Sequence, residues 1–256
     1  MKLPSLSYQI DGNGQNIVLL HGFLESPNMW KSFINHINGA LRTINIQIPN
    51  HNPNGELVYL NSLSQQADLI HQTLSKLQVD NPIFIGHSLG GYLALAYAEK
   101  YSEQMAGLVL VNSTCFADNE ERKEQRTRAI QLVEKHPEAL VQMAIKNLFP
   151  KASLERHKIE INKLISDAKK LPIPGIQSCL MSMRDRKDRT EVLRHFDKNK
   201  LFIYGKDDPL IPIESSKNAI RESKCPSIGL SAGHMAWLED KDTLQKVLLE
   251  FIRQTL

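Results

Sequence analysis

The sequence predicts an α/β fold with a mostly parallel central sheet, flanked by helices and interrupted by a helical insertion. Short apolar segments alternate with helical segments along most of the 256 residues, which is typical of repeated strand–helix units. The apolar segments are continuous, as expected for parallel strands that are buried on both faces. Residues 113–196 contain no strand candidate. We therefore expect a core formed by 1–112 and 197–256, with a helical cap at 113–196.

Four strands and three helices are expected before the insertion. Ser26 and Pro27 begin the first helix, because serine caps free N–H groups and proline has no N–H to leave unpaired. A second helix follows, in which apolar residues recur at helical spacing. The expected strands lie at 17–20, 43–48, 83–85 and 108–111, and the expected helices at 26–38, 62–77 and 92–100.

The insertion is helical and carries a surplus of positive charge. Charged helical sequence such as 129–148 fills residues 118–170, and Pro172 and Pro174 separate it from another helix at 176–183. The insertion has 17 Lys and Arg against 12 Asp and Glu, hence +5, whereas the rest of the chain carries −2. This surplus could attract an anionic substrate or an acidic partner, or it could lie on solvated helix faces.

Alternation resumes after the insertion, with strands at 201–204 and 228–230 and helices at 213–221 and 241–254. Ligands bind at the carboxyl ends of parallel strands. An insertion between the strand at 108–111 and the next strand along the chain can therefore act as a lid.

Cysteine usage and hydropathy indicate the environment of the protein. Cys115, Cys179 and Cys225 form an odd set without Cys-x-x-Cys spacing, so free thiols in a reducing compartment are expected and a zinc site is not. No apolar run is long enough to cross a membrane, and the first residues lack a stretch of signal-peptide length. We expect a cytoplasmic protein that binds neither membrane nor nucleic acid and needs no metal or cofactor.

Residues 86–90 read Gly-His-Ser-Leu-Gly between a predicted strand and a predicted helix. In this context Gly-x-Ser-x-Gly is typical of a nucleophile elbow, a strained turn that exposes the serine hydroxyl. Gly86 and Gly90 leave room for the crowded backbone around Ser88. Ser88 is therefore the candidate nucleophile.

A serine nucleophile needs a base, and the base needs an orienting acid. Of the nine histidines, only His234 follows the strand at 201–204, and it lies directly past the strand at 228–230. The acid should fall between the serine and the histidine in chain order. We expect Asp208 to orient His234 and keep Asp207 as the alternative.

Two backbone amides are expected to stabilise negative charge on a substrate oxygen. One is the N–H of Leu89, at the start of the helix after the elbow. The other is the N–H of Phe23, in the loop after the strand at 17–20. Gly22 allows a close backbone approach in that loop, and His21 is expected to hold the loop by hydrogen bonds.

The chain resembles the α/β-hydrolase superfamily in four segments. These are 21–23 (His-Gly-Phe), 86–91 (Gly-His-Ser-Leu-Gly-Gly), 205–212 (Gly-x-x-Asp-x-x-x-Pro) and 233–235 (Gly-His-Met). Their order and the place of the insertion match a family that carries a helical cap, and the resemblance covers the chain outside 113–196. It implies an α/β-hydrolase fold and a serine esterase, similar to pimeloyl-carrier-protein methyl esterase and related carboxylesterases.

Departures from the family narrow the expected activity. Epoxide hydrolases and haloalkane dehalogenases use an aspartate nucleophile, so Ser88 disfavours both, and Leu24 stands where epoxide hydrolases usually have proline. The menaquinone-pathway synthase, a lyase, has arginine where this chain has Tyr92. The loop at 47–54 lacks the family's Asp-x-x-Gly-x-Gly turn, and we expect His51 to have a surface-loop role rather than to contact substrate.

These observations predict a serine hydrolase that cleaves a carboxylic ester or thioester through an acyl-serine intermediate. Leu148 and Phe149 of the insertion are expected to line the acyl pocket. By resemblance, Arg122, Arg126 and Arg128 could form a face for an acidic carrier protein. A menaquinone-pathway-type lyase or a carbon–carbon hydrolase using the same three residues is the alternative, and a non-catalytic binding protein is less expected.

Overall fold

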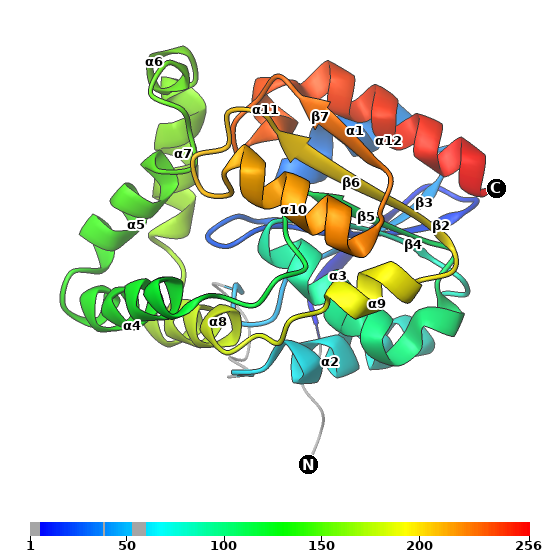
Figure 1. Ribbon diagram of the computed structural model, residues 1–256, viewed down its shortest axis with the longest axis horizontal. Coiled ribbons are helices and arrows are strands. Elements are labelled where there is room, and N and C mark those ends of the chain that lie inside the picture. Colours follow the sequence, from blue (N-terminus) through cyan, green and yellow to red (C-terminus); the bar gives the residue numbers. More distant parts are fainter. Residues whose placement is uncertain (1–5, 38, 53–59) are drawn as a thin grey trace.

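The structure is a computed structural model that describes residues 6–37, 39–52 and 60–256. Within these residues a seven-stranded sheet has the order β1-β3-β2-β4-β5-β6-β7 (Figure 1). β1 runs antiparallel to β3, and all the other neighbours are parallel. The strands are β1 (Tyr8–Asp11), β2 (Asn16–Leu20), β3 (Arg42–Ile46), β4 (Ile83–His87), β5 (Gly107–Val111), β6 (Asn199–Gly205) and β7 (Ser227–Leu230).

β1 is the strand that the sequence patterns do not indicate. All four of its residues are exposed, so it has no continuous apolar run. It lies at the edge of the sheet and pairs with β3 alone. The six parallel strands confirm the predicted mostly parallel α/β sheet.

Strand side chains alternate between two apolar cores. Val18 and Leu20 face one core, whereas Ile17 and Leu19 face the other. The first core is covered by α2 (Leu63–Lys76), α3 (Leu89–Tyr101, followed by η2, Ser102–Gln104), α9 (Thr190–His195) and α10 (Ile213–Ser223). The second is covered by η1 (Pro27–Trp30), α1 (Lys31–Ile37), α11 (Ala236–Glu239) and α12 (Lys241–Thr255).

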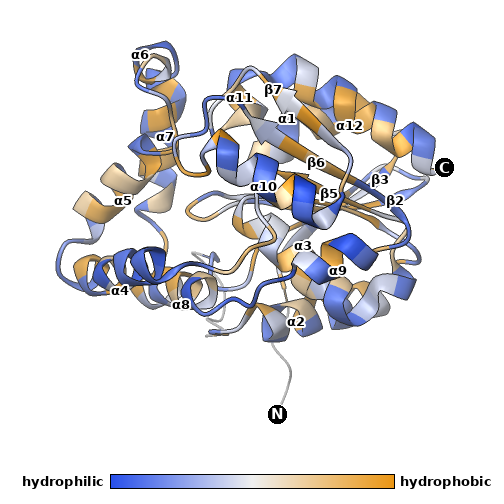
Figure 2. Cartoon of the chain, viewed as in Figure 1, coloured by the Kyte–Doolittle hydropathy of each residue, from blue (hydrophilic) through white to orange (hydrophobic). Residues whose placement is uncertain are grey.

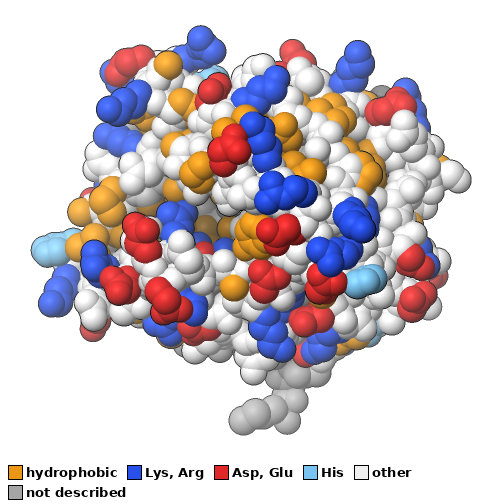
Figure 3. Space-filling model, viewed as in Figure 1, with side chains coloured by type: hydrophobic (Ala, Val, Ile, Leu, Met, Phe, Trp, Pro, Cys, Tyr) orange, Lys and Arg blue, Asp and Glu red, His pale blue; other side chains and the backbone are white. Residues whose placement is uncertain are grey.

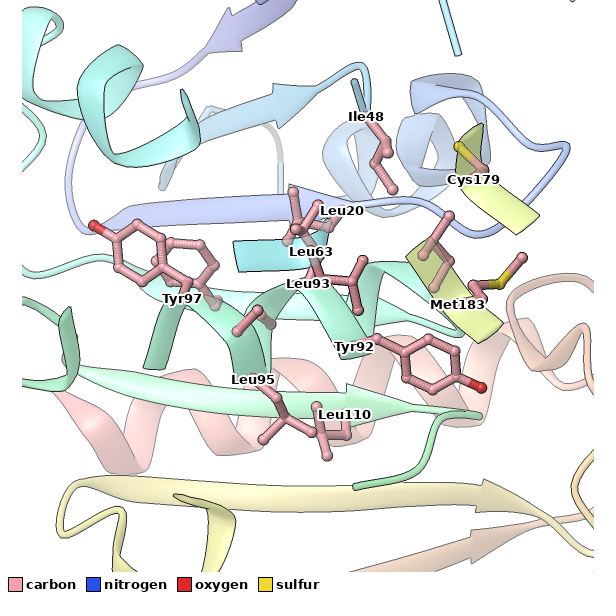
Figure 4. Packing of buried hydrophobic residues seen from close by; sticks show 14 of the residues in the cluster. Leu20, Ile48, Leu63, Tyr92, Leu93, Leu95, Tyr97, Leu110, Cys179 and Met183 are labelled. Atoms are coloured by element: carbon pink, nitrogen blue, oxygen red, sulfur yellow. The ribbon is translucent and has the colours of Figure 1, made fainter. Parts of the chain in front are cut away.

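The interface between α3 and the sheet positions the elbow. Figure 4 shows Leu93 of α3 close to Leu20 of β2, and Leu95 close to Leu110 of β5. These side chains are buried, with at most 1% of their surface exposed. The start of α3 is therefore fixed above the carboxyl ends of the central strands.

Six helices lie between β5 and β6 among the described residues. They are α4 (Glu120–Lys135), α5 (Pro137–Lys146), α6 (Ser153–Arg156), α7 (Lys158–Ala168), α8 (Ile173–Arg184) and α9. α4 to α8 stand beyond the carboxyl ends of the strands, at the left in Figure 1. α9 instead packs against α10 and α3. The division into a core (1–112 and 197–256) and a cap (113–196) stays a prediction.

The expected helical segment at 129–148 is divided at His136. α4 ends at Lys135 and α5 begins at Pro137. Proline cannot continue a helix, because it lacks the N–H and its ring clashes with the preceding turn, but it is favoured at a first helical position. The break therefore lies where proline requires it.

α4 is largely solvated, whereas α8 is attached to the core by side-chain hydrogen bonds. Val133 is the buried residue of α4, whose surface is mostly hydrophilic (Figure 2). On α8, the Ser178 hydroxyl accepts a hydrogen bond from the Asn50 amide at 2.9 Å. The Ser182 hydroxyl accepts one from Gln66 of α2 at 2.9 Å. In the part of the chain that the structure describes, no helix combines the length and the apolar character needed to cross a bilayer.

Gly175→Ala should destabilise the protein, although alanine in a helix is usually more stable than glycine by about 0.5–1 kcal/mol. A Cβ atom at Gly175 would lie 2.1 Å from the backbone carbonyl oxygen of Asn50. Backbone cannot move aside as a flexible side chain can, and overpacking costs about 1–3 kcal/mol. Urea denaturation of both proteins measures the difference. An equal or higher midpoint for the variant would contradict the close packing of α8 on the core.

Candidate active site

Ser88 occupies the turn between β4 and α3 with a backbone conformation that side-chain-bearing residues rarely adopt. Its φ and ψ angles are 51° and −115°. A Cβ atom on Gly86 would lie 2.4 Å from the carbonyl oxygen of Gly90, and one on Gly90 would lie 2.4 Å from that of Leu20. Both glycines are therefore required by close backbone contacts. The turn has the strained geometry expected of a nucleophile elbow.

Three of the predicted site residues form a chain of hydrogen bonds. The Oγ of Ser88 lies 2.9 Å from Nε2 of His234, and Nδ1 of His234 lies 2.7 Å from Oδ2 of Asp208. Because the Asp208 carboxylate accepts the proton of Nδ1, Nε2 is free to accept the Ser88 hydroxyl proton. Asp208 is buried, whereas Asp207 is exposed. The structure thus brings Asp208, and not Asp207, to the imidazole.

The Asp208 carboxylate is held on both of its oxygens. Oδ1 accepts the backbone N–H groups of Leu210 and Ile211, at 2.8 and 3.0 Å. Oδ2 also accepts the side-chain amide of Asn112 at 3.1 Å. Burial acts to raise the pKa of Asp208, but the neighbouring His234 and these hydrogen bonds outweigh it and the pKa is lowered. Asp208 is therefore ionised and fixed in orientation.

A buried ion pair lies beneath this chain. His87 Nδ1 lies 3.0 Å from Oε2 of Glu25, and His87 Nε2 lies 2.9 Å from the carbonyl oxygen of His234. Both partners accept, so His87 donates on both sides and carries a positive charge. Burial opposes that charge, but the Glu25 carboxylate and its hydrogen bond outweigh burial and raise the pKa of His87. Burial likewise acts against the Glu25 charge, and His87 lowers the pKa of Glu25.

Glu25 and His51 together shape the loop after β2. Glu25 Oε2 accepts the backbone N–H of Gly22 at 2.6 Å, and His51 Nε2 accepts that of Leu24 at 2.9 Å. The amide of Phe23 lies between these two. Among the described residues, neither the N–H of Phe23 nor that of Leu89 donates a hydrogen bond within the chain. Both predicted amides are therefore available to a substrate oxygen.

The two loop histidines are neutral and structural. His21 Nε2 accepts the N–H of Ile48 at 3.0 Å, and burial lowers the pKa of His21 to about 4. His51 is buried rather than on the surface, contrary to expectation, and burial lowers its pKa to about 3. Its Nδ1 lies 3.2 Å from Sγ of Cys179 in α8. His21 thus holds the loop as expected; the prediction for His51 was wrong, because the loop folds inward. Of the loop at 47–54, residues 53 and 54 lie outside the described residues.

Glu25, His87 and Asn112 are site residues that the sequence patterns did not single out. Asn112 follows directly on β5, and its side chain bridges Asp208 and the carbonyl oxygen of Gly233. A polar residue at the carboxyl end of a strand neighbouring the elbow was the available signal for Asn112. His87 lies inside the elbow motif, but its partner Glu25 is 62 residues away, so only the fold reveals the pair.

A cavity of about 200 Å³ lies over Ser88, between the core and the inserted helices. Leu148 lines it, together with apolar residues of α4, α5 and α8. Phe149 is not among its lining residues in the described chain: this side chain is buried, with its ring 6.3 Å from that of His157. The side chains of Leu148 and Phe149 point in different directions because α5 has ended at Lys146.

The three arginines of α4 do not share one surface. Arg122 and Arg126 line the cavity, whereas Arg128 is exposed and pairs with Glu124. Arg126 is itself half-buried in a contact with Asp118. Positions four residues apart lie on one side of a helix, but a position two further along turns away. The expected single face of Arg122, Arg126 and Arg128 was wrong.

No group of three or more His, Cys, Asp or Glu side chains that could hold a metal ion is found within the described ranges. The three cysteines are unpaired and buried. Burial raises the pKa of the Cys115 thiol to about 11, so the neutral thiol predominates at neutral pH.

The sequence model described as the alpha/beta hydrolase fold matches residues 15–159, more than half of the chain. The chain belongs to the α/β-hydrolase family. This confirms the family and the fold class that the motifs indicated.

Two curated members of the α/β-hydrolase family illustrate the range of relatives. A 2-hydroxy-6-oxononadienedioate/2-hydroxy-6-oxononatrienedioate hydrolase of Burkholderia vietnamiensis is 23% identical over 273 residues, covering 96% of this chain and 90% of the relative. A pimeloyl-[acyl-carrier protein] methyl ester esterase of Vibrio vulnificus is 25% identical over 271 residues, covering 96% and 97%. The chain is similar along almost its whole length to hydrolases that are named for different reactions.

Solved structures of α/β-hydrolases superimpose closely. A thermophilic esterase from Thermogutta terrifontis has a TM-score of 0.90 at 24% identity and covers 98% of this chain and 93% of its own. The enol-lactonase from Burkholderia xenovorans has a TM-score of 0.87 at 19% identity and covers 97% and 96%. At these identities the likeness shows the fold.

Glu25→Gln should destabilise the protein by about 3–5 kcal/mol, because it leaves a buried cation opposite a neutral amide. His87→Gln alone should also destabilise it. The free energy of unfolding lost in the double variant should be about 0.5–3 kcal/mol smaller than the sum of the losses in the two single variants. Urea denaturation of the four proteins measures this. Strictly additive effects would show that the two side chains are not coupled.

The same pair predicts a pH dependence of stability. The pKa of His87 is raised from 6.5, so its stabilising contribution is complete below that value and is lost as pH rises through the higher folded pKa. The pKa of Glu25 is lowered from 4.5, so its contribution is lost as pH falls through the lower folded pKa. The stability difference between the wild type and Glu25→Gln should narrow as pH rises above neutral. A constant difference from pH 6 to 10 would contradict a charged His87.

Proposed function

We propose that the protein is a serine hydrolase that cleaves carboxylic esters or thioesters through an acyl-serine intermediate. The observation that carries the proposal is the hydrogen-bonded chain of Ser88, His234 and Asp208 at the end of a cavity. The strained elbow exposes the hydroxyl, and the buried carboxylate fixes the imidazole. Each feature has the role that acyl transfer requires.

In the proposed mechanism Ser88 Oγ attacks the carbonyl carbon while Nε2 of His234 takes the hydroxyl proton. Asp208 keeps the other ring nitrogen protonated and stabilises the imidazolium that forms. His234 then gives its proton to the leaving oxygen or sulfur. A water molecule, deprotonated by His234, hydrolyses the acyl-serine and restores the enzyme.

The backbone amides of Phe23 and Leu89 would stabilise the negative charge that develops on the carbonyl oxygen. Neighbouring amides of the Phe23 loop are held by Glu25 and His51, which leaves this one to point toward a substrate. Amides fixed in advance need no reorganisation during the reaction, which makes such stabilisation effective.

The cavity supports a small-molecule substrate, with Leu148 contacting the acyl group. Relatives named as esterases support an ester, although relatives of this family are named for other hydrolytic reactions as well. We do not propose an acidic carrier protein as a partner, because the arginines of α4 do not share one surface. We place the protein in the cytoplasm, a proposal that its three unpaired cysteines support.

Ser88→Ala should lower kcat for p-nitrophenyl butyrate by about 10⁴- to 10⁶-fold, because the nucleophile is lost while binding groups remain. Release of p-nitrophenolate measures the rate, and circular dichroism checks the fold. Activity within tenfold of wild type in the folded variant would remove Ser88 from the mechanism.

Asp208→Asn should lower kcat by about 10⁴-fold, because an amide at this position favours the wrong imidazole tautomer. Asp207→Asn is the matched control, since this neighbouring side chain is exposed and does not contact the imidazole. Steady-state kinetics on p-nitrophenyl butyrate compare the two variants. A larger loss for Asp207→Asn would reverse the assignment within the pair.

A carbon–carbon hydrolase would use the same three residues on a ketone. Three relatives carry names of 2-hydroxy-6-oxo acid hydrolases, so this is the second candidate. Cleavage of a 2-hydroxy-6-oxodienoate together with very slow ester turnover by the same enzyme would favour it over the esterase.

A further inference from the structure

Two arginines share one carboxylate beside the cavity, and one of them, Arg126, lines the cavity itself. Nε of Arg126 and Nη1 of Arg186 both contact Asp118, with Arg186 2.7 Å from Oδ1. The three side chains are shielded, with exposed fractions of 13%, 5% and 3% for Arg126, Arg186 and Asp118. The cluster therefore carries one positive charge that no carboxylate of its own neutralises.

Arg186 makes more contacts with the protein than Arg126 does. Arg186 donates to the carbonyl oxygens of Phe116 and Met183, and its guanidinium lies 4.2 Å from the centre of the Tyr92 ring. Within the described chain, Nη1 and Nη2 of Arg126 donate no hydrogen bond, and Arg126 lines the cavity. Two of its donor groups are thus left for a ligand.

The surroundings of Arg126 add positive rather than negative charge. Arg122, one turn earlier on α4, lines the same cavity and donates to Gln125 without a carboxylate partner in the described residues. Glu25 also lines the cavity, but His87 balances its charge. Arg122 and Arg126 also border an outer groove of about 580 Å³, where Glu121 is an exposed acid. Figure 3 shows Lys or Arg side chains within a hollow on this face.

Tyr92 links the elbow to the cluster of Arg126, Arg186 and Asp118. Tyr92 lies one turn along α3 from Ser88, an advance of about 6 Å, and Figure 4 shows its ring beside Met183 of α8. Arg186 stacks on that ring, and Arg126 neighbours Arg186 through Asp118. The cavity that holds both Ser88 and Arg126 also has apolar lining residues, among them Ala129, Leu180 and Met183. An apolar acyl chain fits this lining.

We infer that the substrate is an ester or thioester whose acyl chain ends in a carboxylate, bound by the Arg126 guanidinium. The inference rests on the proposed function, because it takes Ser88 as the atom that attacks the other end of the chain. Burial lowers the pKa of Arg126 while Asp118 opposes this effect, and arginine stays charged. A carboxylate accepts from both terminal nitrogens at once and neutralises the unbalanced charge, which is the geometry that arginine favours.

A pair of substrates tests the inference. Mono-p-nitrophenyl adipate and p-nitrophenyl hexanoate share leaving group and chain length and differ in the terminal carboxylate. The wild type should have a kcat/KM for the adipate ester about 10- to 100-fold higher, mostly through KM. Equal values, or a preference for hexanoate, would overturn the inference while leaving the proposed function intact. Hydrolysis of neither ester would instead count against the proposed function.

Arg126→Met should reduce the adipate-to-hexanoate ratio to about one. Arg126→Lys keeps the charge but not the two parallel donors, so it should retain part of the preference. This variant also serves as a control for a folding defect of Arg126→Met. Arg128→Met is the matched control, because this side chain is exposed on another side of α4 and should change neither rate. A preference that survives in Arg126→Met would overturn the assignment to this residue.

Binding without turnover gives an independent measurement. In Ser88→Ala, monomethyl adipate should raise the melting temperature more than methyl hexanoate does, and Arg126→Met in the same background should abolish the difference. This readout decides the inference even if neither p-nitrophenyl ester is hydrolysed. Equal shifts from the two methyl esters would overturn it.

Discussion

The buried ion pair of Glu25 and His87 joins three of the loops from which the candidate site is built. His87 ends β4 and precedes Ser88, Glu25 belongs to the loop after β2, and the carbonyl oxygen that His87 contacts is that of His234 after β7. One imidazolium therefore sets the spacing between the elbow, the loop with the free amide of Phe23 and the imidazole that faces Ser88. Two buried charges are costly unless they are well paired. Here the contacts that offset this free-energy cost also position the site.

Backbone strain is also found at the same edge of the sheet. Leu24, Asn50, Ser88 and Asn112 each follow a different parallel strand, and each has a φ angle between 46° and 72°. Side-chain-bearing residues persist in this conformation only where surrounding contacts impose it. The Asn112 side chain donates to the carbonyl oxygen of Gly233, and the Leu24 N–H donates to Nε2 of His51. Four strained residues therefore lie at the edge of the sheet where a substrate would bind.

The sequence was informative where function depends on local pattern and silent where it depends on contacts between distant segments. Ser88 and His234 were predicted from a turn motif and from a position after a strand, and the structure brings them together. Glu25 could not be assigned, because its role depends on a histidine 62 residues away. Helical spacing placed Arg126 on one face of α4, but it could not tell which face is buried. Phe149 was expected in the pocket, but the end of α5 turns it away from its neighbour.

The inserted helices differ in how their side chains bind the core. Ser178 and Ser182 bind α8 to the core, and α4 packs along α8 (Figure 1). Among the described residues, α5–α7 have one side-chain hydrogen bond to the core, which the Ser153 hydroxyl donates to the Glu239 carboxylate. Side-chain hydrogen bonds therefore fix α8 to the core at more points than α5–α7, whose attachment depends on buried apolar contacts. Arg126 lies on α4, so its place over the core is set through the helix that polar side chains hold.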